Sequence, residues 1–259
     1  MSKSKSNRDR REMVEQMRKQ AKAAERRRTT AVVAVCVAVA LIIVGVAGYS
    51  VYRNTQQQNA LDNTALGDIG APATSAGCEA IRQNSATGAG QHTTAKVLYK
   101  TSPPSFGPHN PTPDSSGLHF FTAADRPPVE VLVHNLEHGW TIVWYDDTVA
   151  NNSAEMQNLK ATATKFDQHG NDPHYNMIIA PWLKTDGDGQ PIPDGKHVAF
   201  THWSVHQPTY DPNYYATAES AAKSWGESQY CSTFSGGALK DFMKRFPYDD
   251  APEGFLWHQ

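Results

Sequence analysis

The sequence predicts an α+β protein in which one transmembrane helix precedes a compact extracytoplasmic domain with a mixed β-sheet and about three helices. Three observations support this class. Residues 31–49 carry no charge and follow a strongly basic N-terminus. Beyond them, short β-branched and aromatic runs alternate with amphipathic segments and with loops rich in Gly and Pro. Two cysteines, Cys78 and Cys231, lie near the two ends of this second part.

The N-terminal part divides into a basic tail and a membrane span. Residues 1–29 are expected to form a cytoplasmic tail, because Lys and Arg crowd this segment and end in Arg26, Arg27 and Arg28. Residues 30–52 are expected to form the transmembrane helix, since the uncharged run is long enough for a bilayer core of about 30 Å. The positive-inside rule then places the rest of the chain outside the cell membrane. A cleaved signal peptide is the alternative, although its basic region would be unusually long.

The exterior part is predicted to be a tether followed by one domain. Residues 53–76 are polar and poor in aromatics, which indicates a flexible tether, and 77–259 provide enough chain for one core. After Arg53 there are 12 Lys and Arg against 22 Asp and Glu, a net charge of −10, which argues against nucleic acid as a partner. Cys78 and Cys231 are the only exterior cysteines, so an oxidising environment predicts a disulfide between them.

The exterior elements follow from local patterns. Strands are expected at 96–100, 129–133, 140–145, 175–182 and 197–205, and helices at 152–168, 214–229 and 238–246. The five prolines of 101–116 predict a stiff loop. The order of elements resembles the C-terminal half of a thioredoxin-like fold, but without a CxxC motif no redox activity is inferred.

The central motif is His134-Asn135-Leu136-Glu137-His138-Gly139. A separation of four places His134 and His138 on one face in a helix or a strand, and two imidazoles together suit zinc or copper. Histidines that only close a turn are the structural alternative. The motif also matches the inverted zinc-peptidase pattern H-x-x-E-H, with Glu137 as base, but Gly139 and the strand-like flanks favour a turn over the helix this chemistry needs.

Further ligands are expected to come from other segments. The proline-rich loop presents His109 in a fixed place, and His92 or Met177 is a candidate additional ligand. Imidazoles with an optional thioether favour copper, while zinc accepts three histidines equally well.

Several of these motifs together resemble a family of bacterial single-pass membrane proteins catalogued as a domain of unknown function, DUF 3105. The resemblance is carried by Tyr99, by PPSFGPH at 103–109, by VHNLEHG at 133–139, and by the closing Ala251-Pro252-Glu253. His92 falls where the family tends to have a histidine. The family usually reads PPTSGPH, so Ser105 and Phe106 depart from its pattern. The resemblance implies a shared site and shared boundaries, but no activity.

Three functions are compatible with these patterns. The leading hypothesis is a membrane-anchored, extracytoplasmic metal-binding module for copper or zinc. The alternative is an accessory subunit that docks on another membrane protein complex and whose histidines are structural. A hydrolase with Glu137 as base is the weakest, because no separate nucleophile motif is found; these patterns favour a role that is not enzymatic without deciding the question.

Overall fold

The computed structural model describes residues 2–86, 88–206 and 223–254. The chain forms two compact units, Met1–Gln57 and Gln58–Gln259.

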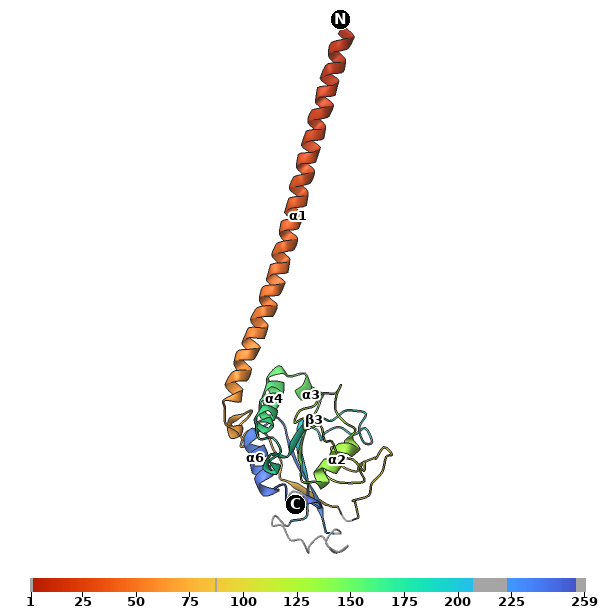
Figure 1. Cartoon of the computed structure of the whole chain (residues 1–259), viewed down its shortest axis with the longest axis vertical. Coiled ribbons are helices and arrows are strands. Elements are labelled where there is room, and N and C mark those ends of the chain that lie inside the picture. Colours follow the sequence, from red (N-terminus) through yellow and green to blue (C-terminus); the bar gives the residue numbers. More distant parts are fainter. Residues whose placement is uncertain (1, 87, 207–222, 255–259) are drawn as a thin grey trace. The chain divides into compact units, whose positions relative to one another are not determined.

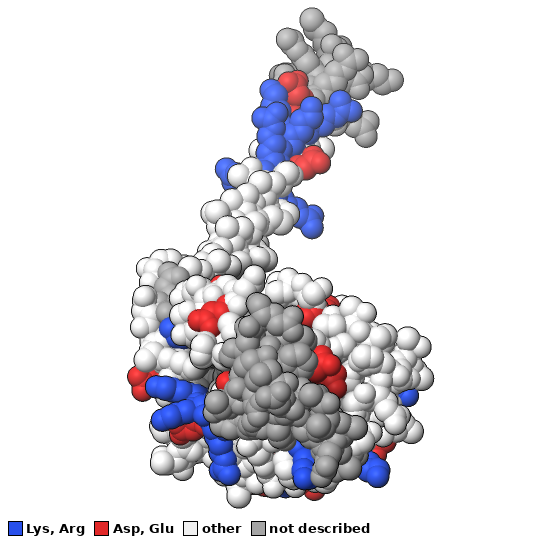
Figure 2. Space-filling view, turned by 60° about the horizontal axis from the view of Figure 1, so that its bottom comes forward, with Lys and Arg blue, Asp and Glu red and all other residues white. Residues whose placement is uncertain are grey.

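The first unit is almost entirely one helix, α1, which spans Ser2–Asp62. Its segment Met13–Arg53 is long and apolar enough to cross a membrane, as judged by length and composition. Lys and Arg crowd the N-terminal part of α1, and an uncharged stretch follows (Figure 2). The helix is therefore a candidate membrane span, and it contains the predicted span at 30–52.

The segment expected to be a tether contains more structure than its composition indicates. Helix α1 continues to Asp62, and a short 3-10 helix, η1, spans Leu66–Asp68. Ile69 and Ala76 are fully buried in the second unit, and the Ala71 amide donates a hydrogen bond to the Phe234 carbonyl. Residues 69–76 therefore pack as part of the folded unit.

A mixed five-stranded sheet forms the centre of the second unit, as the sequence predicts. Its strands are β1 (Arg82–Ser85), β2 (Thr141–Tyr145), β3 (Met177–Pro181), β4 (Val198–Ser204) and β5 (Trp225–Cys231), in the spatial order β1-β5-β4-β2-β3. Strands β2 and β3 are parallel, whereas the other neighbouring pairs are antiparallel. From β2 onward, this order is compatible with the thioredoxin-like arrangement.

Helices cover both faces of the sheet (Figure 1). Helices α4 (Ser153–Asp167) and α6 (Gly236–Arg245) pack on one face, with a core that includes Leu159, Phe166, Leu239 and Phe242. Helix α2 (Val129–Glu137) lies over the other face and contributes Leu132, Val133 and Leu136 to a second core. A short helix, α3 (Asp147–Ala150), and a 3-10 turn, η2 (Pro173–Tyr175), complete the described elements.

Most of the later predicted elements are confirmed. Helix α4 begins after Asn152, whose side chain accepts hydrogen bonds from the Ala154 and Glu155 amides, as an N-cap does. Strands β2, β3 and β4 and helix α6 occupy the segments predicted for them.

Three predicted elements are wrong in type. Residues 129–133 belong to helix α2, because Val129, Leu132, Val133 and Leu136 repeat at helical spacing and all become buried; this packing outweighs the strand preference of valine. Residues 96–100 are irregular, and the Val97 amide donates to the Glu130 carboxylate and not to a strand partner.

The predicted helix at 214–229 is the third of these. Residues 225–229 belong to β5, where cross-strand pairing with both β1 and β4 decides the backbone conformation. The segment 214–222 lies outside the described residues.

The predicted disulfide is present. Cys78 and Cys231 are bonded, and the bond joins residues separated by 153 positions in sequence. Among the described residues, Cys36 is the one free cysteine. A bonded pair in this unit is consistent with an oxidising compartment.

Candidate metal centre

Helix α2 positions three polar side chains at its C-terminal end. Its apolar stripe packs on the sheet, so His134 and Glu137, one turn apart, are held against the loops that cover this face, and both are buried. His138 is the C-cap residue. The chain then turns sharply at Gly139, which has a φ of 84° and where an added Cβ would lie 1.9 Å from the Tyr248 carbonyl oxygen. Only glycine permits this close approach.

The proline-rich loop holds His109 in one place. The Tyr99 hydroxyl donates to the Pro108 carbonyl at 2.9 Å, and Gly107 lies so close to the Tyr99 ring that a Cβ there would be 2.8 Å from it. His109 also forms a parallel bridge with His92, through the Gln91 carbonyl and the Thr93 amide. The loop therefore places His109 beside His92, with the His109 side chain fully buried.

These segments converge on one cluster, which we call the His/Glu cluster. Its members are His92, His109, His134, Glu137, His138 and Glu253. Nε2 of His109 lies 2.9 Å from Oε2 of Glu137, and Nε2 of His138 lies 3.2 Å from Oε2 of Glu253. Glu253 arrives from the C-terminal segment, where its amide donates to the Glu137 carbonyl.

The ring nitrogens of two histidines have assigned roles. Nδ1 of His109 lies 2.8 Å from the Gly107 carbonyl oxygen, and Nδ1 of His134 lies 2.6 Å from that of Asn110. A carbonyl oxygen only accepts, so Nδ1 carries the proton in both rings. In the neutral rings, Nε2 is then left with its lone pair directed into the cluster, which is how metal-ligating histidines are commonly oriented.

One of these nitrogens has no satisfactory partner. Nε2 of His109 is within ion-pair distance of Glu137, yet it makes no hydrogen bond of acceptable geometry with any described residue. Leaving a fully buried polar atom without a partner costs about 1–3 kcal/mol. A proton on Nε2, or a metal cation between His109 and Glu137, would satisfy both groups.

The electrostatics of the cluster favour neutral His134 and His138 beside an ionised Glu137, whereas His109 is shifted the other way. Burial lowers the pKa of His138 to about 4, with His134 adding to the effect, and burial also lowers the pKa of His134. For His109, burial alone would lower the pKa, but the Glu137 carboxylate and the Gly107 carbonyl outweigh this effect and raise the pKa. Burial alone would raise the pKa of Glu137, but the facing histidines lower it. For Glu253, burial and then Glu137 raise the pKa.

The cluster contains two overlapping sets of donors that could hold a metal ion. The first set is His92, His109, His134 and Glu137, and the second is His134, His138 and Glu253. Within each set all ligand atoms lie within 4.8 Å of one another. Ligands of a tetrahedral ion with bonds of 2.0–2.1 Å are about 3.3 Å apart, so side-chain shifts of roughly 1 Å would close either set.

The structure brings four of the five predicted ligands together. His92, His109, His134 and His138 all belong to the cluster, whereas Met177 is fully buried in the core on the opposite face of the sheet, beside α4 and α6. The sequence motifs did not indicate the two carboxylates, Glu137 and Glu253, as candidate ligands. From the sequence motifs, Glu137 was considered only as a catalytic base, and Glu253 only as part of the closing Ala-Pro-Glu motif.

Helix α2 carries only part of the zinc-peptidase pattern, because it ends at Glu137, with His138 as its C-cap and Gly139 in the turn that follows. His134 and Glu137 do lie on a helix, whereas Gly139 and the strand-like flanks predicted a turn. Glu137 nevertheless lies against His109, among the candidate ligands.

Fold and site together define an α+β domain with a buried cluster of histidines and carboxylates, preceded by a candidate membrane helix. The chain belongs to the family described as "Protein of unknown function (DUF3105)", whose model matches residues 91–255, more than half of its length. Comparison with curated proteins and with solved structures gives no match.

Proposed function

We propose that this protein is a membrane-anchored module that binds a divalent late transition-metal ion, zinc or copper(II), in the His/Glu cluster on the extracytoplasmic side. The observation that carries this proposal is the convergence of three histidines and Glu137, whose ligand atoms lie within 4.8 Å of one another, while backbone carbonyls fix Nδ1 of His109 and His134. In the neutral ring, Nε2 of His109 faces the Glu137 carboxylate without a proton to share, and this arrangement supports a bound cation.

We assign the ion to the four-donor set, His92, His109, His134 and Glu137. This set offers one more donor than the second set, and three of its members are buried. Three imidazoles and one carboxylate complete a four-coordinate shell without a further protein ligand. His138 and Glu253 then form an adjacent polar wall, in which Nε2 of His138 lies 3.2 Å from Oε2 of Glu253.

The donor types narrow the choice of metal. Imidazole suits zinc and copper, whereas hard cations such as Ca²⁺ prefer sets made only of oxygen. The sequence-based preference for copper depended partly on a thioether from Met177, which packs in the opposite core. Zinc and copper(II) therefore remain the two proposed ions. A competition experiment that measures which ion the protein binds more tightly distinguishes them.

The anchor and the disulfide support the proposed location. The span Met13–Arg53 has its basic residues on the N-terminal side, which favours a cytoplasmic N-terminus, and the bonded pair Cys78 and Cys231 suits an oxidising exterior. The candidate partner of this first unit is thus the lipid bilayer.

Thermal unfolding with and without metal tests the proposal. All six tryptophans lie between positions 140 and 257, so tryptophan fluorescence of the full chain in nanodiscs reports on the domain that carries the cluster. An ion at one hundred times its dissociation constant should add about 2.7 kcal/mol to the free energy of unfolding. Binding should weaken in mild acid, because protons compete for the imidazoles.

Matched variants make this test specific. His92→Ala changes an exposed ligand and should remove most of the metal-dependent stabilisation, whereas His174→Ala, an exposed histidine outside the cluster, should leave it intact. Equal midpoints with and without zinc or copper in the wild type, under demonstrated excess of metal, would contradict the proposal. That outcome would favour a structural cluster in an accessory subunit.

A further inference from the structure

A cavity of about 660 Å³ lies on the face of the sheet that α4 and α6 cover, and its lining extends to Gly139, which follows the C-terminal end of α2. Its walls come from the end of α4, from η2, from the end of α6 and the residues after it, and from residues 65–67. Among the described residues, none that lines it belongs to the His/Glu cluster. Its size is that of a typical small-molecule site.

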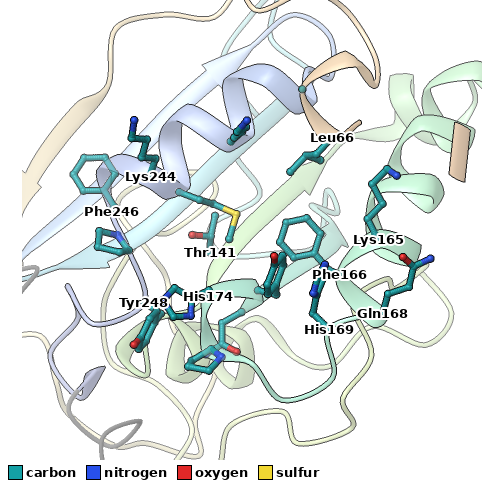
Figure 3. A pocket seen from close by; sticks show the side chains of 18 of the residues that line it. Leu66, Thr141, Lys165, Phe166, Gln168, His169, His174, Lys244, Phe246 and Tyr248 are labelled. Atoms are coloured by element: carbon teal, nitrogen blue, oxygen red, sulfur yellow. The ribbon is translucent and has the colours of Figure 1, made fainter. Parts of the chain in front are cut away.

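The interior of this cavity is mainly aromatic and apolar. Phe166, Tyr175, Phe246, Tyr248 and Met243 line it, and Met243 is only partly buried although it packs against the core. Figure 3 shows Phe246 and Tyr248 on one side and Phe166 opposite, with Thr141 between them. Such a surface favours an apolar ligand body over water.

The rim of the cavity is basic. Lys165, Lys240 and Lys244 line it together with His169 and His174, and no aspartate or glutamate is among its described lining residues. The chain after Arg53 has 22 Asp and Glu against 12 Lys and Arg, and only nine of these are lysines. A third of those lysines at one cavity is thus a local reversal of the charge of the domain.

Two of the lysines are placed to act together. Lys240 and Lys244 are exposed, lie four residues apart on α6 and so share one face of the helix. Within the part of the chain that the structure describes, neither forms an ion pair. Two ammonium groups without a carboxylate partner, above an aromatic interior, are complementary to an acidic group attached to an apolar body.

We propose that this cavity binds an amphipathic anion, with its carboxylate or phosphate at Lys240 and Lys244 and its apolar body against Phe166, Phe246 and Met243. A free fatty acid and an anionic membrane lipid share this chemistry. The cavity wall at residues 65–67 begins only twelve positions after Arg53, the end of the candidate span. Both sources of the ligand therefore suit a domain attached to a membrane. The proposal is independent of metal binding.

Photo-crosslinking of the full chain in phosphatidylcholine nanodiscs tests this inference. The probe is octanoate with a photoreactive diazirine on its chain, and mass spectrometry locates the labelled peptides. Labelling is expected on α6 around Met243 and on 165–176. Excess octanoate should compete, whereas octanol, which lacks the charge, and inorganic phosphate, which lacks the apolar body, should not.

Two variants and one control keep the experiment decisive. Lys240→Gln with Lys244→Gln should lower cavity labelling about tenfold, and Met243→Glu should lower it to a similar degree. Lys160→Gln with Lys184→Gln removes the same charge from α4 and a loop, away from the cavity, and should leave labelling unchanged. Wild-type labelling in the double cavity variant, or equal competition by octanol, would overturn the proposal.

A second arm identifies the source of the ligand. Nanodiscs that contain diazirine-labelled phosphatidylglycerol should give the same labelled peptides if the ligand is a membrane lipid. Octanoate labelling without lipid labelling supports the cavity as a site for a soluble fatty acid. Lipid and octanoate labels that both lie outside the cavity would contradict the inference.

Discussion

Nε2 of His134 and Nε2 of His138 lie 2.8 Å apart, closer than the roughly 3.3 Å between two ligands of one tetrahedral ion. Because Nδ1 of His134 donates to the Asn110 carbonyl, Nε2 of the neutral ring must accept, and His138 is the donor. A bound ion would replace this hydrogen bond at His134, while His138 keeps its neighbour Glu253.

This relationship predicts unequal effects of two substitutions on metal affinity. His138→Ala removes a competitor for the His134 lone pair but also a polar neighbour of the site, so zinc affinity should change by about tenfold at most, the lower end of the range for an outer-shell partner. Glu137→Gln removes a charged ligand and should weaken binding by more than about a hundredfold. Titration calorimetry with zinc compares the two. A larger loss with His138→Ala would place the ion in the set of His134, His138 and Glu253.

The disulfide predicts a strong stability effect that does not depend on metal. Cys231→Ser opens a loop of 153 residues, and chain-entropy models place the cost for so long a loop near the top of the 0–5 kcal/mol range. Urea unfolding of the full chain measures it, with Cys36→Ser as the control, because Cys36 is the free cysteine of α1. Equal midpoints for wild type and Cys231→Ser would show that the bond contributes nothing.

A buried ion pair predicts a second stability effect. Arg126 and Asp186 lie 2.7 Å apart with both side chains buried, and the Asp186 carboxylate also accepts from the Leu183 amide. Asp186→Asn leaves the guanidinium without a charge partner and should cost about 3–5 kcal/mol. Asp188→Asn, two residues away in the same turn, is exposed and should cost little. Similar urea midpoints for the two variants would contradict this role.

The buried His202 predicts how stability depends on pH. Burial lowers its pKa to about 4, whereas the unfolded chain keeps a pKa near 6.5. The unfolded state therefore binds the proton first, so stability is complete above about pH 6.5 and falls as the pH drops toward 4. This single group contributes a slope of up to about 1.4 kcal/mol per pH unit in that window.

His202→Gln tests this contribution directly. The amide can still meet the Asp250 carbonyl but does not titrate, so the variant should lose less stability than the wild type between pH 6.5 and 4.5. His174→Gln, at an exposed site, should keep the wild-type slope. Parallel pH profiles of the free energy of unfolding for wild type and His202→Gln would contradict the assignment.

The sequence predicted those features that depend on local chemistry or on simple counting. The uncharged run and the Asn152 cap are each recognisable within a short segment, and the disulfide follows from the count of two exterior cysteines. The spacing of His134 and His138 indicated a shared face without knowledge of the backbone. The mixed sheet followed from the order of elements.

The errors occurred where packing decides the outcome. The run at 129–133 is rich in valine, and only burial of its helical stripe on the sheet shows that it is α2. Glu253 is more than a hundred residues from Glu137 in sequence, and the hydrogen bond between their backbones joins them only in the fold. Met177 is a plausible residue both for a metal ligand and for an apolar core. Its place in the opposite core depends on which face of β3 it occupies.

The central claim is that the His/Glu cluster binds one metal ion per chain. Equilibrium dialysis of the full chain in nanodiscs against zinc or copper, followed by elemental analysis, tests it most directly in wild type, His134→Ala and the control His174→Ala. The account predicts about one ion per chain in wild type and control, and almost none in His134→Ala, since both donor sets contain His134. The same metal content in all three proteins, or none in the wild type, would contradict it.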